Sequence, residues 1–247
     1  MKIVVIGGTG LIGSKVVTRL GEHGHQAVAA APNTGVNTLT GEGVKEVLQG
    51  ADVVIDVSNS PSFADDDVMK FFRTSTTNLL DAAGGAGVGH YVALSIVGTD
   101  RLPESGYFRA KVAQEELIKG SGLPYSLVHA TQFFEFAGGI ADSATAGGEV
   151  RLSGANVRPM AAADVAAAVG RAAAGAPSNG TVEVAGPEVF GLDQWIRTVL
   201  IARSDPREVV TDPQSRYFGA VLKLDSLLPG RDAQIAQTHL SEWLARQ

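Results

Sequence analysis

The chain has 247 residues, of which 45% are apolar, and a formal net charge of −6. This apolar content is enough for a sizeable core and excludes disorder over most of the chain. The acidic balance argues against a surface that follows nucleic-acid phosphates, so we expect no nucleic-acid partner. The absence of cysteine excludes disulfides and thiolate-bound metals, and it fits the cytoplasmic location that we expect.

The first residues, a lysine followed by the apolar run 3–6, resemble the start of a signal peptide. The run ends at Gly7 and is too short for the apolar region of such a peptide, so we expect a buried strand instead. No stretch reaches the roughly 18 apolar residues of a membrane helix, and we expect no membrane partner.

Short apolar runs alternate with segments of helical periodicity up to about residue 130. Most of these runs are continuous, which favours strands covered on both faces, as in a parallel sheet. The expected strands are 2–6, 26–30, 52–57, 90–94 and 125–128, and the expected helices are 11–21, 43–49, 65–83 and 107–119. This order predicts an α/β fold with a doubly wound parallel sheet of the Rossmann type.

The alternation loosens after residue 130. We expect an alanine-rich helix that has Asp164 in its first turn and runs to Ala174, a strand at 181–185, and helices at 193–202 and 232–246. No linker is long enough to separate two independent domains. We therefore predict a single domain, 1–247, in which 1–130 form the core and 131–247 form a small C-terminal region.

A glycine-rich loop, Gly7-Gly8-Thr9-Gly10-Leu11-Ile12-Gly13, follows the first strand. Glycines three residues apart in a strand–turn–helix context are typical of dinucleotide-binding loops, since they allow a tight turn, close approach of a pyrophosphate, and helix–sheet packing. The helix N-terminus adds free N–H groups and a partial positive charge. The alternative is a glycine-rich turn without a ligand. We predict cofactor contacts at Gly7, Thr9, Gly10, Leu11, Ile12 and Gly13.

The residues after the second strand bear on which dinucleotide binds. NAD sites usually carry a carboxylate here that bonds the ribose, but no Asp or Glu occurs between Glu22 and Glu42. No Lys or Arg occurs there either. Because the repulsive carboxylate is absent, we favour NADP(H) over NAD(H). We expect the cofactor to contact Pro32, Asn33 and Thr34 here, and Ser58 and Asn59 after the third strand.

Tyr107 and Lys111 are four residues apart at the start of an expected helix, which places them on one face. Ser95 stands just after the fourth strand, at the edge where parallel sheets bind ligands. An ammonium one turn away is expected to lower the phenol pKa from about 10. Tyr107 can then pass a proton to a carbonyl oxygen that Ser95 holds, while Lys111 bonds the nicotinamide ribose. The plainer alternative is a solvated pair on a helix surface.

These residues carry a resemblance to the short-chain dehydrogenase/reductase superfamily, in its atypical NmrA-like branch. The matching segments are the glycine loop, 77–83, 125–133, 164–166 and 184–188. The resemblance implies a Rossmann fold, NAD(P) binding, and either reductase chemistry or ligand sensing. Phe72 stands where many relatives carry an active-site asparagine, and His129 where NmrA-like relatives often have arginine. The retained pair of Tyr107 and Lys111 favours an enzyme.

We expect the substrate to contact Ser95, Tyr107, His129, Gln132 and Phe133. His129 is as easily a structural histidine, and Phe133 a core residue. The histidines lack metal-ligand spacing, so we expect no metal. We predict an NADP(H)-dependent oxidoreductase acting on a small carbonyl compound or alcohol, with 1–130 binding the cofactor and 131–247 the substrate. The family resemblance suggests a homodimer. The alternatives are a non-catalytic NAD(P)-sensing regulator and a sugar-nucleotide epimerase or isomerase.

Overall fold

The computed structural model describes residues 1–247. Its centre is a seven-stranded sheet in the order β14-β9-β5-β4-β3-β1-β2, in which all neighbouring strands are parallel. The predicted Rossmann-type α/β fold is therefore confirmed. The strands are β1 (Lys2–Ile6), β2 (Gln26–Ala30), β3 (Val53–Asp56), β4 (His90–Ile96), β5 (Tyr125–Ala130), β9 (Gly180–Ala185) and β14 (Gln234–Ile235).

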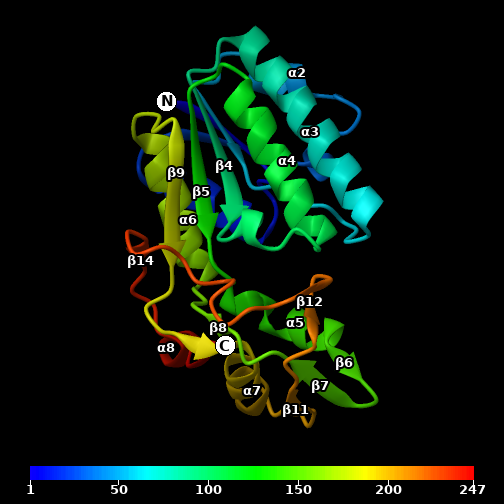
Figure 1. Ribbon diagram of the computed structural model, residues 1–247. Helices are drawn as coiled ribbons and strands as arrows, with labels where there is room; N and C mark the ends of the chain where they lie inside the picture. Colours follow the sequence, from blue (N-terminus) through cyan, green and yellow to red (C-terminus); the bar gives the residue numbers. More distant parts are fainter.

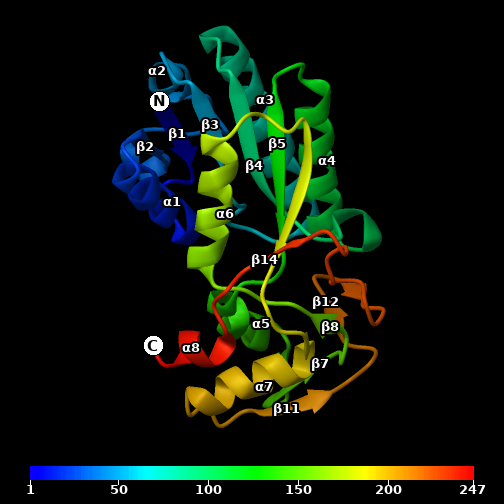
Figure 2. The same ribbon diagram turned by 90° about the vertical axis from the view of Figure 1, so that its left-hand side faces the viewer.

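Helices cover both faces of this sheet (Figures 1 and 2). On one face α3 (Asp65–Ala86) packs against α4 (Gly106–Gly120), with the short α2 (Val44–Leu48) beside α3. On the other face α1 (Leu11–Glu22) packs against α6 (Ala162–Ala174). Alternate residues of β1 therefore enter two different cores, and this explains why its apolar run is continuous.

A smaller region lies beyond the carboxyl ends of the central strands (Figure 1). Its buried core includes Phe134 and Trp195. The region contains α5 (Ala137–Ser143), α7 (Leu192–Ala202) and α8 (Leu240–Leu244), together with a sheet of β6 (Thr145–Ala146), β7 (Glu149–Leu152) and β11 (Glu208–Thr211). Two further strand pairs are β8 (Asn156–Val157) with β10 (Phe190–Gly191) and β12 (Arg216–Tyr217) with β13 (Ala220–Val221).

Three 3₁₀ helices complete the connections: η1 (Pro32–Thr34), η2 (Thr99–Arg101) and η3 (Phe134–Phe136). None of the helices combines the length and the apolar character that a membrane crossing requires.

The terminal helix expected over 232–246 is wrong for most of its length. Gln234 and Ile235 form β14 on the open edge of β9, and only Leu240–Leu244 is helical. The backbone groups at that edge need partners, and pairing with β14 supplies them. The helix begins late because the Glu188 carboxylate accepts from the Leu240 N–H at 2.8 Å and fixes the chain there.

Candidate functional site

The loop between β1 and α1 has a backbone that demands glycine. Gly7 has φ +76°, in the left-handed region that residues with side chains rarely adopt. A Cβ added to Gly13 would lie 2.1 Å from the carbonyl oxygen of Gly7. Glycine at these two positions therefore lets α1 begin directly against the carboxyl end of β1.

The first turn of α1 presents free hydrogen-bond donors. Its N-cap, Gly10, has no side chain to cap the helix, and the N–H groups of Leu11, Ile12 and Gly13 donate to no other backbone group. Thr9, Gly10 and Leu11 are exposed. Free donors at a helix N-terminus attract phosphate. The loop therefore fits the pyrophosphate of a dinucleotide.

All three residues of η1 are exposed, and only the side chain of Asn33 has hydrogen-bond donors that are free for a ligand. The Thr34 hydroxyl accepts from the Ala31 N–H at 2.9 Å and so turns the chain. Asn33 is exposed, and its Oδ1 accepts from the Thr9 hydroxyl at 3.1 Å. This contact ties η1 to the glycine loop and leaves the amide N–H groups of Asn33 as donors.

Tyr107 lies in the first turn of α4, and its hydroxyl donates to Oδ1 of Asn59 at 3.0 Å. The neighbour of Asn59, Ser58, lies against the glycine loop, since a Cβ on Gly7 would meet the Cα of Ser58 at 3.0 Å. Two adjacent residues therefore join the phenol to the expected cofactor loop.

The pKa of the Tyr107 phenol differs from the sequence-based expectation. Burial raises this pKa to about 12, whereas the lysine one turn away was expected to lower it. The lowering is a wrong prediction, because the cost of burying a phenolate exceeds the lowering effect of the hydrogen bond with Asn59. Tyr107 is consequently a protonated donor at neutral pH.

Lys111 is 3% exposed and lies under the α4 face that carries Tyr107. Its ammonium donates to the carbonyl of Leu94 at 2.9 Å and to the side chain of Gln114. The same ammonium lies over the ring of Phe72, 4.5 Å from the centroid. Phe72, which stands in place of the family asparagine, therefore supports Lys111 by a cation–π contact.

A buried carboxylate balances this ammonium. Asp56, at the end of β3, is 1% exposed and accepts from Nε2 of Gln114 at 3.0 Å and from the Ser58 hydroxyl at 2.6 Å. Burial lowers the pKa of Lys111 to about 8, while the charges of Asp56 and Glu115 act to raise it. Gln114 thus links the ammonium of Lys111 to the Asp56 carboxylate.

Ser95 joins a different group of side chains. Its hydroxyl donates to Oε1 of Glu115 at 2.6 Å, and the same oxygen lies 2.9 Å from Nε2 of His129. Glu115 lies about two helical turns after Tyr107 on α4. The structure therefore brings Tyr107 and Asn59 into contact, and it brings Ser95 and His129 together around Glu115.

The environment of the Glu115 carboxyl favours its ionised form. Burial acts to raise the pKa of Glu115, but the hydrogen bond and charge of His129, the hydrogen bond from Ser95 and the charge of Lys119 outweigh it and lower the pKa to about 2. Lys119 lies 3.3 Å from the carboxylate.

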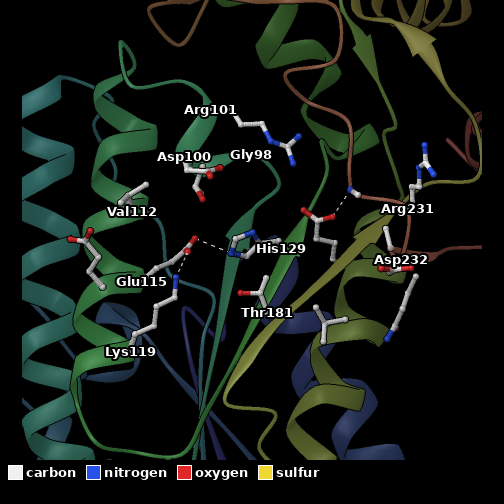
Figure 3. Close-up of a pocket in the computed structure, with 17 residues that line it drawn as sticks. Gly98, Asp100, Arg101, Val112, Glu115, Lys119, His129, Thr181, Arg231 and Asp232 are labelled. Carbon is white, nitrogen blue, oxygen red and sulfur yellow. Dashed lines mark hydrogen bonds and ion pairs between the residues drawn. The ribbon is translucent and has the colours of Figure 1, made fainter.

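A cavity of about 740 Å³ opens beside this group (Figure 3). Only 3 of its 17 lining residues are hydrophobic, and the charged ones have both signs, for example Arg101, Arg231, Asp100 and Glu183. Neither Tyr107 nor any residue of the glycine loop lines it. The cavity is therefore separate from Tyr107 and the glycine loop, although His129, a predicted substrate contact, lines it.

Aromatic rings surround Tyr107 instead. Phe218, at the tip of the β12–β13 hairpin, stacks on the Tyr107 ring with centroids 5.3 Å apart and an interplanar angle of 25°. Phe63, in the loop after β3, lies 5.4 Å from Tyr107 and 5.5 Å from Phe218. The smaller region thus reaches back over the expected catalytic residue.

Two further predicted substrate contacts lie after β5. Gln132 is 6% exposed, and its Oε1 has no hydrogen-bond partner in the protein. Burial raises the pKa of Tyr217, and a hydrogen bond with Gln132 opposes this, so the two side chains meet next to Phe218. Phe133 is half-buried, packs against the core under α6, and has its ring 5.2 Å from that of Phe136.

Sequence reasoning missed Asp56, Gln114, Glu115, Phe63 and Phe218. Helical spacing gives a signal for two of them, because Gln114 and Glu115 follow Lys111 by one turn. The other residues approach Tyr107 and Lys111 only through tertiary structure, and no local pattern predicts that approach.

The fold and the glycine loop together define an NAD(P)-binding protein of the Rossmann type. A family model described as NAD(P)H-binding matches residues 7–174, and the chain belongs to that family. The match confirms the resemblance to the short-chain dehydrogenase/reductase superfamily and its NmrA-like branch as far as NAD(P) binding and the Rossmann fold are concerned.

Two curated relatives carry the name photosystem II assembly factor Ycf39. The chain is 28% identical to the one from Cyanophora paradoxa and 24% identical to the one from Synechocystis, each over 149 residues. The match covers 55% of this chain and 46% of each relative. The chain thus spans about half the length of these relatives.

Several solved structures share the fold. MoeE5 in complex with UDP-glucose and NAD has a TM-score of 0.75 at 18% identity, with 99% of this chain and 96% of that chain covered. The NADPH-dependent quinone oxidoreductase QOR2 from Escherichia coli has a TM-score of 0.65 at 21% identity, with 85% and 77% covered. The UDP-glucose 4-epimerase of Thermus thermophilus has a TM-score of 0.70 at 19% identity, with 92% of each chain covered. At these identities the likeness concerns the fold alone.

Proposed function

We propose that this protein is an NADPH-dependent oxidoreductase that reduces a small carbonyl compound, with Tyr107 as the proton donor. One observation carries the proposal: a half-buried, protonated phenol is joined to the glycine loop through Asn59 and Ser58. Proton donors in carbonyl reduction must lie where a hydride arrives, and cofactors of Rossmann proteins bind at this edge of the sheet.

The proposed chemistry uses the residues as they stand. When bound, the reduced nicotinamide supplies a hydride to the carbonyl carbon. Tyr107 turns its hydroxyl from Asn59 to the carbonyl oxygen and gives up its proton, so that the C=O bond becomes an alcohol. The pKa of Lys111, lowered to about 8 by burial, leaves it mostly protonated at pH 7. Its charge one turn away stabilises the phenolate until the proton is replaced.

In this proposal Ser95 acts through Glu115 and not on the substrate oxygen. Its hydroxyl is committed to the Glu115 carboxylate at 2.6 Å. That carboxylate contributes to the charge balance of Lys111. Ser95 is thus a positioning residue, and its replacement by alanine changes the pH dependence of turnover more than the affinity for substrate.

The cofactor preference belongs to the proposal. Asn33 offers amide donors beside the glycine loop, and no carboxylate in η1 repels a 2′-phosphate. Titration with NADPH and NADH, followed by cofactor fluorescence, measures the preference directly. Tighter binding of NADH contradicts it.

The central test replaces Tyr107 by phenylalanine. We expect turnover of a panel of aldehydes and ketones to fall by about 100-fold or more, because a positioned acid contributes rate enhancements on this order. The affinity for NADPH should stay near that of the wild type. The control is Tyr125→Phe, at the opposite end of the sheet. Full activity in the Tyr107→Phe protein contradicts the proposal.

The second candidate is a cofactor-binding protein that acts through a protein partner. Two observations favour it: the relatives bear the name of an assembly factor, and Phe218 covers Tyr107. Wild-type protein that binds NADPH and NADP⁺ with different affinity, but oxidises no NADPH with any carbonyl of the panel, supports this candidate over the enzyme.

A further inference from the structure

Four aromatic rings, those of Phe63, Phe72, Phe108 and Phe218, lie near the Tyr107 ring. Phe63 and Phe218, which we call the aromatic clamp, touch each other and the Tyr107 ring. Phe72 approaches the same ring from below, with centroids 6.0 Å apart. Aromatic rings prefer such stacked and tilted contacts with other rings at these separations.

The aromatic clamp is open to solvent although its members are large and apolar. Phe63 is 53% exposed and Phe218 is 39% exposed. The two side chains come from segments far apart in the sequence, the loop after β3 and the tip of the β12–β13 hairpin. Contiguous exposed aromatic surface beside a buried polar group is typical of a ligand site.

The hairpin holds Phe218 against local preference. Tyr217 pairs with Ala220, so Phe218 and Gly219 form a two-residue turn with φ +47° and +88°. Such turns favour asparagine, aspartate or glycine at both positions, and a bulky residue in this conformation is strained. This strained turn is also the segment that places the Phe218 ring against the Tyr107 ring.

A polar atom next to the hairpin is also left unsatisfied. Oε1 of Gln132 is buried without a hydrogen-bond partner, although Gln132 contacts Tyr217, the residue before Phe218. A buried acceptor without a partner costs free energy, and a hydroxyl substituent on a bound aromatic ring is a donor that satisfies it.

We infer that the substrate is a planar aromatic carbonyl compound whose ring enters between Phe63 and Phe218. This inference rests on the proposed function and specifies its substrate class. The ring displaces Phe218 from Tyr107, stacks against the aromatic clamp, and presents its carbonyl oxygen to the phenol. A saturated ring of the same size has no π face to stack on the two phenyl rings.

The test compares two aldehydes of equal ring size, benzaldehyde and cyclohexanecarbaldehyde, in the full-length protein with NADPH. The measured quantity is the ratio of their kcat/KM values. Their intrinsic reactivities differ, but this difference is the same in every variant. In Phe218→Leu we expect the ratio to fall about fivefold towards the saturated aldehyde, since leucine keeps an apolar side chain and removes the ring. Tyr125→Leu, at the far end of β5, should leave the ratio unchanged.

A binding measurement separates this inference from the proposed function. Saturation-transfer NMR on the Tyr107→Phe protein detects benzaldehyde ring protons without turnover, and the added Phe218→Leu change should remove the signal. Turnover of both aldehydes with a ratio that Phe218→Leu does not alter overturns the substrate class and leaves the reductase standing. Absence of turnover in the wild type overturns the proposed reductase. In that case an NMR signal still supports an aromatic ligand site at the aromatic clamp, and absence of the signal overturns that site as well.

Discussion

The hydroxyl of Tyr107 donates to Oδ1 of Asn59 at 3.0 Å, across the gap between the first turn of α4 and the loop after β3. This bond fixes where the phenol points, because Asn59 follows Ser58, whose backbone packs on Gly7. The geometry of the proposed acid therefore depends on a residue of the cofactor side of the fold.

Replacing Asn59 by alanine removes the acceptor that orients the phenol. We expect kcat to fall about tenfold, which corresponds to the loss of one hydrogen bond that orients the reacting hydroxyl. The affinity for NADPH should change little. Steady-state kinetics and a cofactor titration measure the two quantities. Asn156→Ala, which loses a comparable 3.0 Å bond to Asp225 in the smaller region, is the matched control. Equal effects of the two variants on kcat contradict the role of Asn59.

Lys111 and Asp56 form a buried charge pair bridged by Gln114. Replacing Lys111 by methionine leaves the Asp56 carboxylate without compensating charge, so we expect the free energy of unfolding to drop by about 2 kcal/mol and kcat to fall about 100-fold. Adding Asp56→Asn should restore much of the stability without restoring turnover. Thermal unfolding and kinetics of the single and double variants check this. A double variant no more stable than Lys111→Met shows that the two charges are not coupled.

The sheet could be predicted because its strands are short apolar runs that can be recognised in the local sequence. Residues 2–6 and 26–30 match β1 and β2 in full, and the helices that begin at Leu11 and Asp65 start where expected. Periodicity and glycine placement decide these elements before any tertiary contact forms. The terminal segment was mispredicted for the opposite reason: the free edge of β9, far away in sequence, determines β14.

Some contacts of the candidate site could likewise be predicted from local sequence, whereas others depend on tertiary structure. Tyr107 and Lys111 share a helix, so their spacing alone predicts a common face. Ser95 and Tyr107 come from different elements, and the sequence does not reveal that Glu115 offers the serine hydroxyl an acceptor. Phe218 is the extreme case, since its place over Tyr107 depends on a turn whose conformation its own residue type disfavours.

The lowered pKa of Glu115 makes the free energy of unfolding depend on pH in the acidic range. The pKa of Glu115 in the folded protein, about 2, lies below the ordinary glutamate value of 4.5, so its contribution to the free energy of unfolding is complete above pH 4.5 and is lost as the pH falls through 2. The difference corresponds to roughly 3 kcal/mol. Urea unfolding at pH 7 and pH 3 should show Glu115→Gln clearly less stable than the wild type at pH 7, with the gap narrowed at pH 3. Glu116→Gln, the exposed neighbour, should behave like the wild type at both values, and a gap independent of pH contradicts the assignment.

The glycine loop allows cofactor binding to be weakened without disturbing the fold. Gly13→Ala places a methyl group 2.1 Å from the Gly7 carbonyl and should abolish NADPH binding, whereas Gly21→Ala, later on α1 with nothing within 4 Å of the added group, should bind normally and gain roughly 0.5–1 kcal/mol of stability.

Leu11→Pro is the sharper change. Proline is tolerated at the first helical position, and the extended backbone of Gly10 suits it, so the helix persists while one free N–H is removed. We expect NADPH affinity to fall about fivefold to tenfold with an unchanged melting temperature of the free protein. Undiminished affinity in a folded Leu11→Pro protein means that the start of α1 does not hold the pyrophosphate.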